Sequence, residues 1–185
     1  MERLEQLQQR IESASQEVRR FSRDLRPSVL DDLGLVPAVK GLLAELEEVG
    51  IATELGISGD SHRLMPDVEL ALFRIVQETL NNVRRHAQAS NVAIDVEFVD
   101  SRVKVAVRDD GQGFELLGSP GDFAYAGKFG LLGVEERVQL LHGHLQVQSS
   151  KGKGTTVSVD VPTEASRPWN SVREPGGESP GDPVD

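Results

Sequence analysis

The stretch from Pro66 to Ala89 constrains the fold most, because it reads as one long amphipathic helix in a chain of 185 residues. Pro66 suits the first turn of a helix, and Asp67 and Glu69 place negative charge where the helix dipole favours it. At 100° per residue, one side of this helix is apolar, and we expect it to be the core face. Its members are Val68, Leu72, Ile75, Val76, Thr79 and Val83.

A polar stripe runs along the edge of that face. Glu78, Asn82 and Arg85 are spaced i, i+4, i+7, so they lie roughly 100° from the apolar centre. A carboxylate, a carboxamide and a guanidinium at the margin of a core are placed to meet a polar ligand in a half-closed cleft. The alternative is a solvated flank with minor ion-pair support, which the helix alone does not exclude.

Composition narrows the class of protein. The length and a hydrophobic content of 38 % suit one core with a helical appendage. A net charge of −10 without a long basic run argues against nucleic acid as the main partner. The absence of cysteine excludes disulfides and thiolate metal sites. With neither an apolar run of roughly 18 residues nor a signal peptide, we expect a cytoplasmic piece without membrane contact of its own. This expectation is compatible with a full-length protein that is anchored to a membrane elsewhere.

The first 26 residues carry a heptad seam. Apolar residues recur there at spacings of 3 and 4: Leu4, Leu7, Ile11, Ala14, Val18, Phe21 and Leu25. Such a narrow stripe needs a second helix, and a symmetric dimer through residues 4–25 is the simplest source. The alternative is a single helix folded onto the domain. Pro27 ends the helix, because the residue before a proline is disfavoured in helical geometry.

A second helix and a short strand are expected before the long helix. Asp31 or Asp32 is a candidate N-cap, and Gly50 is a candidate C-terminal stop. The inward positions are Leu35, Val39, Leu42, Leu43 and Leu46. Residues 51–57 then alternate as a strand.

After the long helix the hydrophobic period changes to 2. Residues 92–98 and 103–107 alternate around the turn at Asp100, which predicts a hairpin with one buried face. Asp109 shares the buried phase of its strand, where an unpaired carboxylate is costly, so it needs a donor. Gly111 and Gly113 follow, and glycines allow close approach of a ligand.

The remaining chain alternates between loop, helix and strand. Residues 115–129 show no period and are rich in glycine, which is typical of a lid. Gly130 begins a helix that Gly143 stops, with Leu131, Val134, Val138 and Leu141 inward. A glycine loop meeting a helix N-terminus is a candidate anion site. Strands are predicted at 144–149 and 155–161, and residues 163–185 read as a disordered tail.

Together these motifs resemble the ATP site of the GHKL superfamily, which contains histidine kinases, type II topoisomerases, Hsp90 and MutL. The segments LRP–LDDLGL at 25–35, QETLNNV at 77–83 and RHA at 85–87 are similar to sensor histidine kinases of the nitrate-sensor and desaturase-sensor type. The resemblance covers residues 4–162. It implies an α+β fold, a two-layer α/β sandwich of the Bergerat type, with an N-terminal coiled-coil-like helix. The implied division is a partial dimerisation hairpin at 1–27, a catalytic domain at 28–162 and a tail at 163–185.

The resemblance also implies roles for individual residues. Asn82 matches the asparagine that holds Mg²⁺ against the triphosphate, and Arg85 and His86 match positions near the phosphates. Asp109 matches the aspartate that accepts from the adenine amino group, with Gly111 and Gly113 admitting the base. The remaining matches are Gly130 and Leu131 for phosphate, and Gly154 and Thr155 near adenine. Lys128 stands where the family more often has glycine, which leaves the lid geometry open.

Two roles have alternatives. Glu78 either assists proton removal from the attacking imidazole, as a catalytic residue beside Asn82, or orders Mg²⁺-bound water, or pairs with Arg85. His86 is either a phosphate contact or a charge at the helix end.

The four histidines are His62, His86, His142 and His144, none in the setting of a phosphoacceptor. We therefore expect Mg·ATP binding and γ-phosphate transfer to a histidine of a separate domain, with a response regulator downstream and no autophosphorylation by this chain alone. The alternatives are a GHKL ATP switch without phosphotransfer and an interaction module that has kept only the fold.

Overall fold

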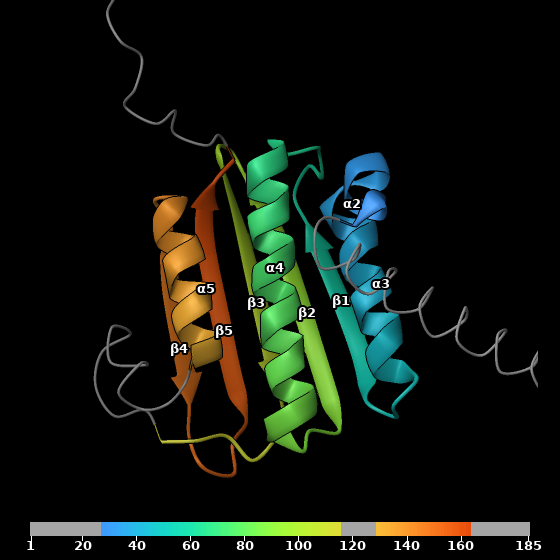
Figure 1. Ribbon diagram of the computed structural model, residues 1–185, viewed down its shortest axis with the longest axis vertical. Coiled ribbons are helices and arrows are strands. Elements are labelled where there is room, and N and C mark those ends of the chain that lie inside the picture. Colours follow the sequence, from blue (N-terminus) through green and yellow to red (C-terminus); the bar gives the residue numbers. More distant parts are fainter. Residues whose placement is uncertain (1–26, 116–128, 164–185) are drawn as a thin grey trace, which may run out of the picture.

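The computed structural model describes residues 27–115 and 129–163. The predicted heptad helix at 4–25, most of the predicted lid and the predicted tail lie outside these residues, so those expectations stay predictions. Figure 1 shows the described part as a single sheet with its helices gathered on one face. This is the predicted two-layer α/β sandwich.

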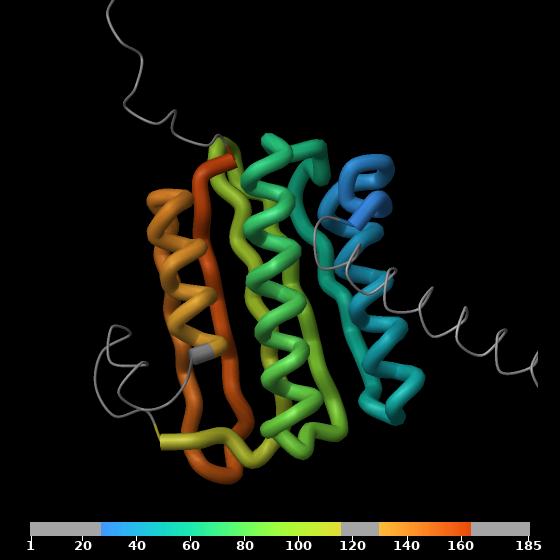
Figure 2. Tube along the Cα trace, viewed as in Figure 1, coloured from blue at the N-terminus to red at the C-terminus, as the bar shows by residue number. Residues whose placement is uncertain are grey.

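The sheet has five strands in the order β1-β2-β3-β5-β4. Their bounds are β1 Ala52–Ser58, β2 Asn91–Val99, β3 Arg102–Asp109, β4 His144–Ser149 and β5 Thr155–Pro162. β1 pairs with β2 in parallel, and the other three pairings are antiparallel. The predicted hairpin is β2–β3, and Figure 2 shows the chain turning back sharply between these two strands.

The helical layer consists of α2 Ser28–Leu33, α3 Leu35–Glu47, α4 Pro66–Asn82 and α5 Phe129–Leu140. A five-residue π-helical turn, η1 Val83–Ala87, continues directly from α4. The expected single helix from 66 to 89 is therefore an α-helix with a π-helical end. Such turns are rare and are found disproportionately at functional sites.

The core lies between α4 and the sheet, as the periodicity predicts. All six residues of the expected core face of α4 are buried, and Leu72, Val68 and Val76 are fully so. Every second residue of β2 and β3 meets them: Val92, Ile94, Val96, Phe98, Val103, Val105 and Val107 are all buried. The inward residues predicted for α5 are also buried. The two hydrophobic periods thus place helix and sheet face to face.

Two expected helix boundaries are wrong. Asp31 and Asp32 lie inside α2 rather than capping the next helix, and Gly34, with a φ of 86°, separates α2 from α3. A left-handed residue of this kind ends one helix and redirects the chain, for which glycine is suited. At the end of α5, the left-handed residue is His142, with a φ of 53°, and not Gly143. Gly143 instead lies against Val161 and Asp160, where a Cβ would not fit.

Candidate functional site

A cavity of about 590 Å³ opens at the C-terminal end of α4. Its walls come from α4, η1, the ends of β3 and β5, the segment after β3 and the start of α5. The lining residues are Glu78, Thr79, Asn82, Val83, Arg85, His86, Ala87, Asp109, Gln112, Gly113, Phe114, Gly130, Leu131, Thr155 and Val157. A cavity of this size, mixing apolar walls with a few polar groups, suits a small-molecule ligand.

The wall from α4 presents Glu78 and Asn82, one helical turn apart and both partly buried. Gly130, at the start of α5, packs directly against them. A Cβ at Gly130 would lie 2.9 Å from Asn82 Nδ2 and closer still to Glu78 Oε1. The glycine therefore lets the N-terminus of α5 approach a carboxylate and a carboxamide of the neighbouring helix.

The wall from η1 presents Arg85 and His86, both exposed. The turn ends at Gln88, which adopts left-handed geometry with a φ of 53°. Gln112 donates hydrogen bonds to two carbonyls of η1. Its side-chain amide donates to His86 O at 2.6 Å, and its backbone N–H donates to Ala87 O at 2.7 Å. Gln112 thus ties the end of the helix to the segment that follows β3.

Asp109, the last residue of β3, also lines the cavity. Its Oδ1 accepts a hydrogen bond from Gly111 N at 2.9 Å, so the chain supplies one donor that the strand pattern lacked. Burial raises the pKa of Asp109, and amide donation from Gly111 and Thr155 offsets part of that rise. In the register of β3 and β5, Asp109 is paired with Thr155, which places both at one end of the cavity.

Asp110, next along the chain, faces a different neighbour. Its carboxylate accepts from the backbone N–H groups of Ser90 and Asn91 at 2.8 and 2.9 Å, and from Asn91 Nδ2 at 2.7 Å. These bonds, the Asn91 side chain first, lower the pKa of Asp110. Asp110 therefore anchors the loop between η1 and β2, and it does not line the cavity described above.

Gly111, Gly113 and Gly154 lie where segments of the chain pack too closely for a side chain. A Cβ at Gly111 would lie 2.7 Å from the Cβ of Ala87, and one at Gly113 would lie 2.7 Å from Gly154 O. Gly154 is similarly pressed against the backbone of Asp109. Gly113 and Gly154 also have φ values of 56° and 72°, which disfavour other residues. Close approach of one segment to another accounts for all three.

The cavity brings together most of the residues that the sequence singles out. Glu78, Asn82, Arg85, His86, Asp109, Gly113, Gly130, Leu131 and Thr155 all line it. Gly111 and Gly154 do not line the cavity, but both pack directly against Asp109. Asn82 and Asp109 thus line the same cavity, and their expected roles at its metal end and base end stay predictions.

Sequence reasoning missed several lining residues. Thr79, Val83 and Val157 looked like core alone, while Ala87, Gln112 and Phe114 carried no pattern of their own. Gln112 is the most informative of these, because its two bonds to η1 depend on a π-helical turn that the sequence does not announce.

Metal-binding and membrane features are limited within the described ranges. Residues 27–115 and 129–163 contain no group of three or more His, Cys, Asp or Glu side chains that could hold a metal ion. The helices of the same ranges include none with the length and apolarity required to span a bilayer.

The family model for "Histidine kinase-, DNA gyrase B-, and HSP90-like ATPase" matches residues 67–165, just over half of the chain. The chain belongs to this ATPase family. The match begins at the second residue of α4 and includes β5, so this ATPase domain contains every residue that lines the cavity.

Curated relatives narrow the type of ATPase domain. The chain is 37 % identical to the signal transduction histidine-protein kinase/phosphatase DegS of Brevibacillus brevis, over 88 % of this chain and 41 % of that protein. It is 38 % identical to the sensor histidine kinase MctS of Rhizobium johnstonii, over 89 % and 35 %. The oxygen sensor histidine kinase NreB of Staphylococcus carnosus is 33 % identical, over 79 % and 41 %. The chain is thus an ATP-binding catalytic domain of the sensor histidine kinase type, and it spans about two fifths of these relatives.

Solved structures share the fold. The histidine kinase domain of the Erythrobacter litoralis EL346 blue-light activated histidine kinase superimposes with a TM-score of 0.53 at 24 % identity, over 68 % of this chain and 57 % of that one. Full-length ShkA, solved in complex with AMPPNP, gives a TM-score of 0.54 at 19 % identity, over 71 % and 30 %.

Proposed function

We propose that this domain binds Mg·ATP in the 590 Å³ cavity and transfers the γ-phosphate to a histidine outside this sequence, as part of a two-component sensor histidine kinase. One observation carries the proposal: the same cavity is lined by Asn82 and by Asp109. Asn82 offers an oxygen that suits a metal ion, and Asp109 offers a carboxylate that can accept a hydrogen bond from adenine. ATP binding is a property of the family, whereas the metal, the transfer and the partners are the proposed parts.

Asp109 is proposed to receive the adenine amino group. Its carboxylate accepts from the backbone amides of Gly111 and Thr155, and its two oxygens can accept further hydrogen bonds from a ligand in the cavity that Asp109 lines. A carboxylate half-buried at the end of a strand is costly unless a donor reaches it, and an exocyclic amine supplies that donor. Thr155, paired with Asp109 across the sheet, places a hydroxyl at the same end, and Gly111, Gly113 and Gly154 shape the backbone there.

Asn82 is proposed to hold the cation through its carboxamide oxygen. Mg²⁺ prefers oxygen ligands and retains several waters, so one protein ligand plus phosphate oxygens suits it. The donor fits this reading, since Asn82 offers a carboxamide oxygen at the wall of the cavity. When bound, Mg²⁺ neutralises charge on the phosphates.

The phosphates are proposed to lie between η1 and the N-terminus of α5. Arg85 and His86 lie on the first side, and Gly130 and Leu131 on the second. Backbone N–H groups at a helix N-terminus, together with its dipole, favour an anion. Phosphoryl transfer consists mainly of positioning and charge stabilisation, which such a set of groups can provide.

Glu78 is proposed to act beside Asn82, taking the proton from the attacking imidazole or ordering metal-bound water. Its side chain lines the cavity and packs against Gly130, at the phosphate end. A carboxylate within reach of the incoming nucleophile is suited to either role.

The wider arrangement is also a proposal. Residues 28–162 form the catalytic domain, residues 1–27 form one helix of a dimerisation hairpin with a homodimer through residues 4–25, and residues 163–185 form a tail. A response regulator takes the phosphate onward. We place the domain in the cytoplasm, without nucleic-acid or membrane contact of its own.

Nucleotide titration tests the first half of the proposal. Calorimetry with ATP, with and without Mg²⁺, should show binding that Mg²⁺ strengthens. Asp109→Ala should abolish binding without unfolding the protein, and Asn82→Ala should remove the effect of Mg²⁺. Lys104→Ala, on the outer face of β3, is the control. Equal binding with and without Mg²⁺ in the wild-type chain would contradict the metal role of Asn82.

A chimera tests the second half. Replacing the aligned region of the Brevibacillus brevis DegS protein with this chain should give a protein that incorporates acid-labile phosphate from radiolabelled γ-ATP. Asn82→Ala in the chimera should abolish incorporation. A chimera that binds Mg·ATP as the isolated chain does, yet incorporates no phosphate, would instead favour an ATP switch without phosphotransfer.

A further inference from the structure

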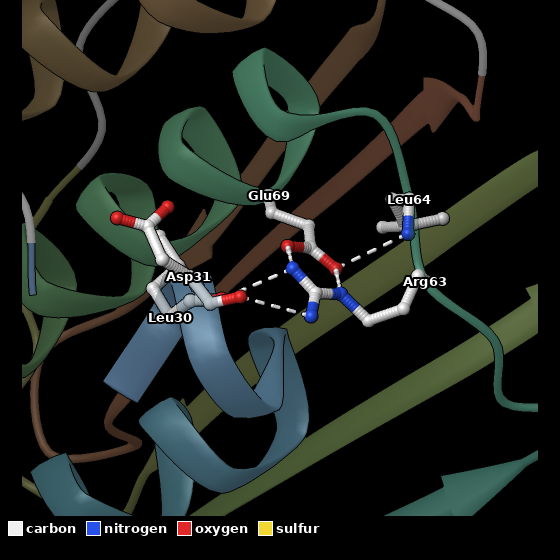
Figure 3. Close-up of polar contacts among 5 residues, drawn as sticks. All are labelled: Leu30, Asp31, Arg63, Leu64 and Glu69. Atoms are coloured by element: carbon white, nitrogen blue, oxygen red, sulfur yellow. Dashed lines mark hydrogen bonds and ion pairs between the residues drawn. The ribbon is translucent and has the colours of Figure 1, made fainter. Parts of the chain in front are cut away.

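An ion pair at the far end of α4 lies outside the cavity. Glu69, in the first turn of α4, is only 2 % exposed, and Arg63 holds it through two parallel bonds. Arg63 Nε and Nη2 donate to Oε1 and Oε2 of Glu69, both at 2.9 Å. The backbone N–H of Leu64 donates to Oε1 as well, at 3.1 Å. Figure 3 shows these groups converging between α4 and α2.

Arg63 also reaches the end of α2. Its Nη1 donates to Asp31 O at 3.1 Å, and its Nη2 donates to Leu30 O at 3.3 Å. Leu30 O also accepts from Gly34 N at 3.0 Å, so the guanidinium adds to the backbone bond that ends α2. Gly34 completes the contact, because a Cβ there would lie 3.0 Å from Arg63 Cδ and 3.3 Å from Glu69 Oε1.

The pair thus connects three segments: α2, the loop before α4, and α4 itself. α2 is six residues long and begins at the first described residues, so the chain that precedes the domain enters through it. An isolated helix of that length has little stability of its own. Its position therefore depends on what it packs against: Leu30 is fully buried in the core, and the Arg63 fork holds its carbonyls.

We propose that Arg63 and Glu69 form a clamp that fixes the direction in which the preceding chain enters the domain, and so positions the ATP site for phosphotransfer. This inference rests on the proposed function. Arg63 is a positioning residue and not a catalytic one, because it contacts neither the cavity nor any group that lines it.

The geometry explains why the clamp should act on transfer and not on ATP binding. From Glu69, α4 runs unbroken to Asn82, 13 residues further along the chain. At 1.5 Å per residue this is about 20 Å, far beyond direct contact with nucleotide. Figure 1 shows α2 beside the end of α4 at which the chain enters from β1, and α5 beginning near the other end. A stiff helix between the two makes the orientation of α2 and that of the ATP site one rigid unit.

The first experiment measures whether the clamp holds α2. Arg63→Gln in the full chain removes the charge and the fork, and the glutamine amide keeps one donor for Glu69, whose carboxylate is only 2 % exposed and would otherwise be left unpaired. Amide hydrogen exchange over residues 28–38 should accelerate at least about 10-fold. Arg102→Gln is the matched control, since Arg102 also binds a carboxylate and a backbone carbonyl, both of Asp160, but joins β3 to β5. The control should leave residues 28–38 unchanged.

The second experiment separates positioning from binding, in the DegS chimera described above. Arg63→Gln should lower phosphate incorporation about 10-fold or more, with ATP affinity within about twofold of the parent. Arg63→Lys should recover only part of the activity, because lysine keeps the charge and loses the planar fork. Arg102→Gln should match the parent in both measurements.

The outcomes decide between the two proposals separately. Unchanged exchange over residues 28–38 in Arg63→Gln overturns the clamp, as does a loss of ATP affinity equal to the loss of transfer. Full recovery by lysine would show that charge alone matters and would also overturn it. If the parent chimera transfers no phosphate, the proposed function fails, and a clamp that controls transfer fails with it. The exchange measurement would then still decide whether Arg63 holds α2.

Discussion

Gly130→Ala should separate ligand binding from stability more cleanly than any other single change at the cavity. The backbone of Gly130 needs no positive φ, so alanine is compatible with it, and alanine favours a helix over glycine by up to about 1 kcal/mol. The atoms that the new methyl group would meet are Glu78 Oε1 and the amide of Asn82. Both are ends of side chains, which can move without disturbing the core.

The size of the effect follows from the packing. The new Cβ would lie 2.9 Å from Asn82 Nδ2. Contacts between heavy atoms are optimal at about 3.5–4.0 Å, so the amide must retreat by about 0.6 Å or more. A misplacement of about 1 Å can lower a reaction rate about 100-fold. We expect displacement of the proposed metal ligand to lower Mg·ATP affinity on a similar scale, by roughly 10- to 100-fold. That range corresponds to about 1.4–2.7 kcal/mol of binding free energy.

The assay compares Gly130→Ala with Gly133→Ala, one turn further along α5. A Cβ at Gly133 would meet only the end of the Arg137 side chain, at 3.0 Å, and Gly133 does not line the cavity. Calorimetric titration should show the loss in the first variant alone, while thermal unfolding of both should match or exceed the wild type. Wild-type affinity in Gly130→Ala, or an equal loss in both variants, would refute the reasoning.

Three other changes test the site and its support. Burial raises the pKa of Asp109, so the stability that this carboxyl group contributes is complete in acid and is lost as pH rises through its folded pKa. Asp109→Asn should therefore raise the free energy of unfolding of the apo domain at pH 7.5 relative to wild type, and this gain should be absent below about pH 4 in urea melts. The same variant should lose ATP affinity. For Asp110 the pH dependence is reversed, because hydrogen bonds from Asn91 lower the pKa of this carboxyl group. Asp110→Ala should lower the free energy of unfolding at pH 7.5. The difference from wild type should shrink as pH falls, because the wild-type carboxylate then becomes protonated and loses its stabilising charge. Leu72→Ala, at a fully buried position of α4, should lower the free energy of unfolding by about 2–5 kcal/mol in the same melts.

Periodicity was sufficient to predict the layers of the fold. The 3.6 period of α4 and the alternation in β2 and β3 each identified a buried face, and those faces meet. Burial drives both patterns, so the sequence records them directly. The strands β4 and β5 were predictable for the same reason, and each observed bound lies within a residue of the expected one.

Features that depend on tertiary contacts were not predictable in this way. Glu69 looked like a helix-dipole charge, yet it is buried because Arg63 reaches it from the preceding loop. The carbonyls of the π-helical turn accept hydrogen bonds from Gln112, which is 26 residues from His86 in the chain. Asp31 resembled a cap because aspartate favours that position, but Leu30 docks into the core and extends helical structure through it.

The glycines behind Asp109 bear on how relatives of this domain can lose activity. Because Gly111, Gly113 and Gly154 are demanded by the contact of backbone with backbone, a descendant that no longer handled nucleotide would keep them simply in order to fold. The presence of these three glycines in a relative therefore does not distinguish an active kinase domain from one that has lost nucleotide binding. Asn82 and Glu78 instead present their side chains to the cavity, so we expect decay of function to be recorded at those two positions first.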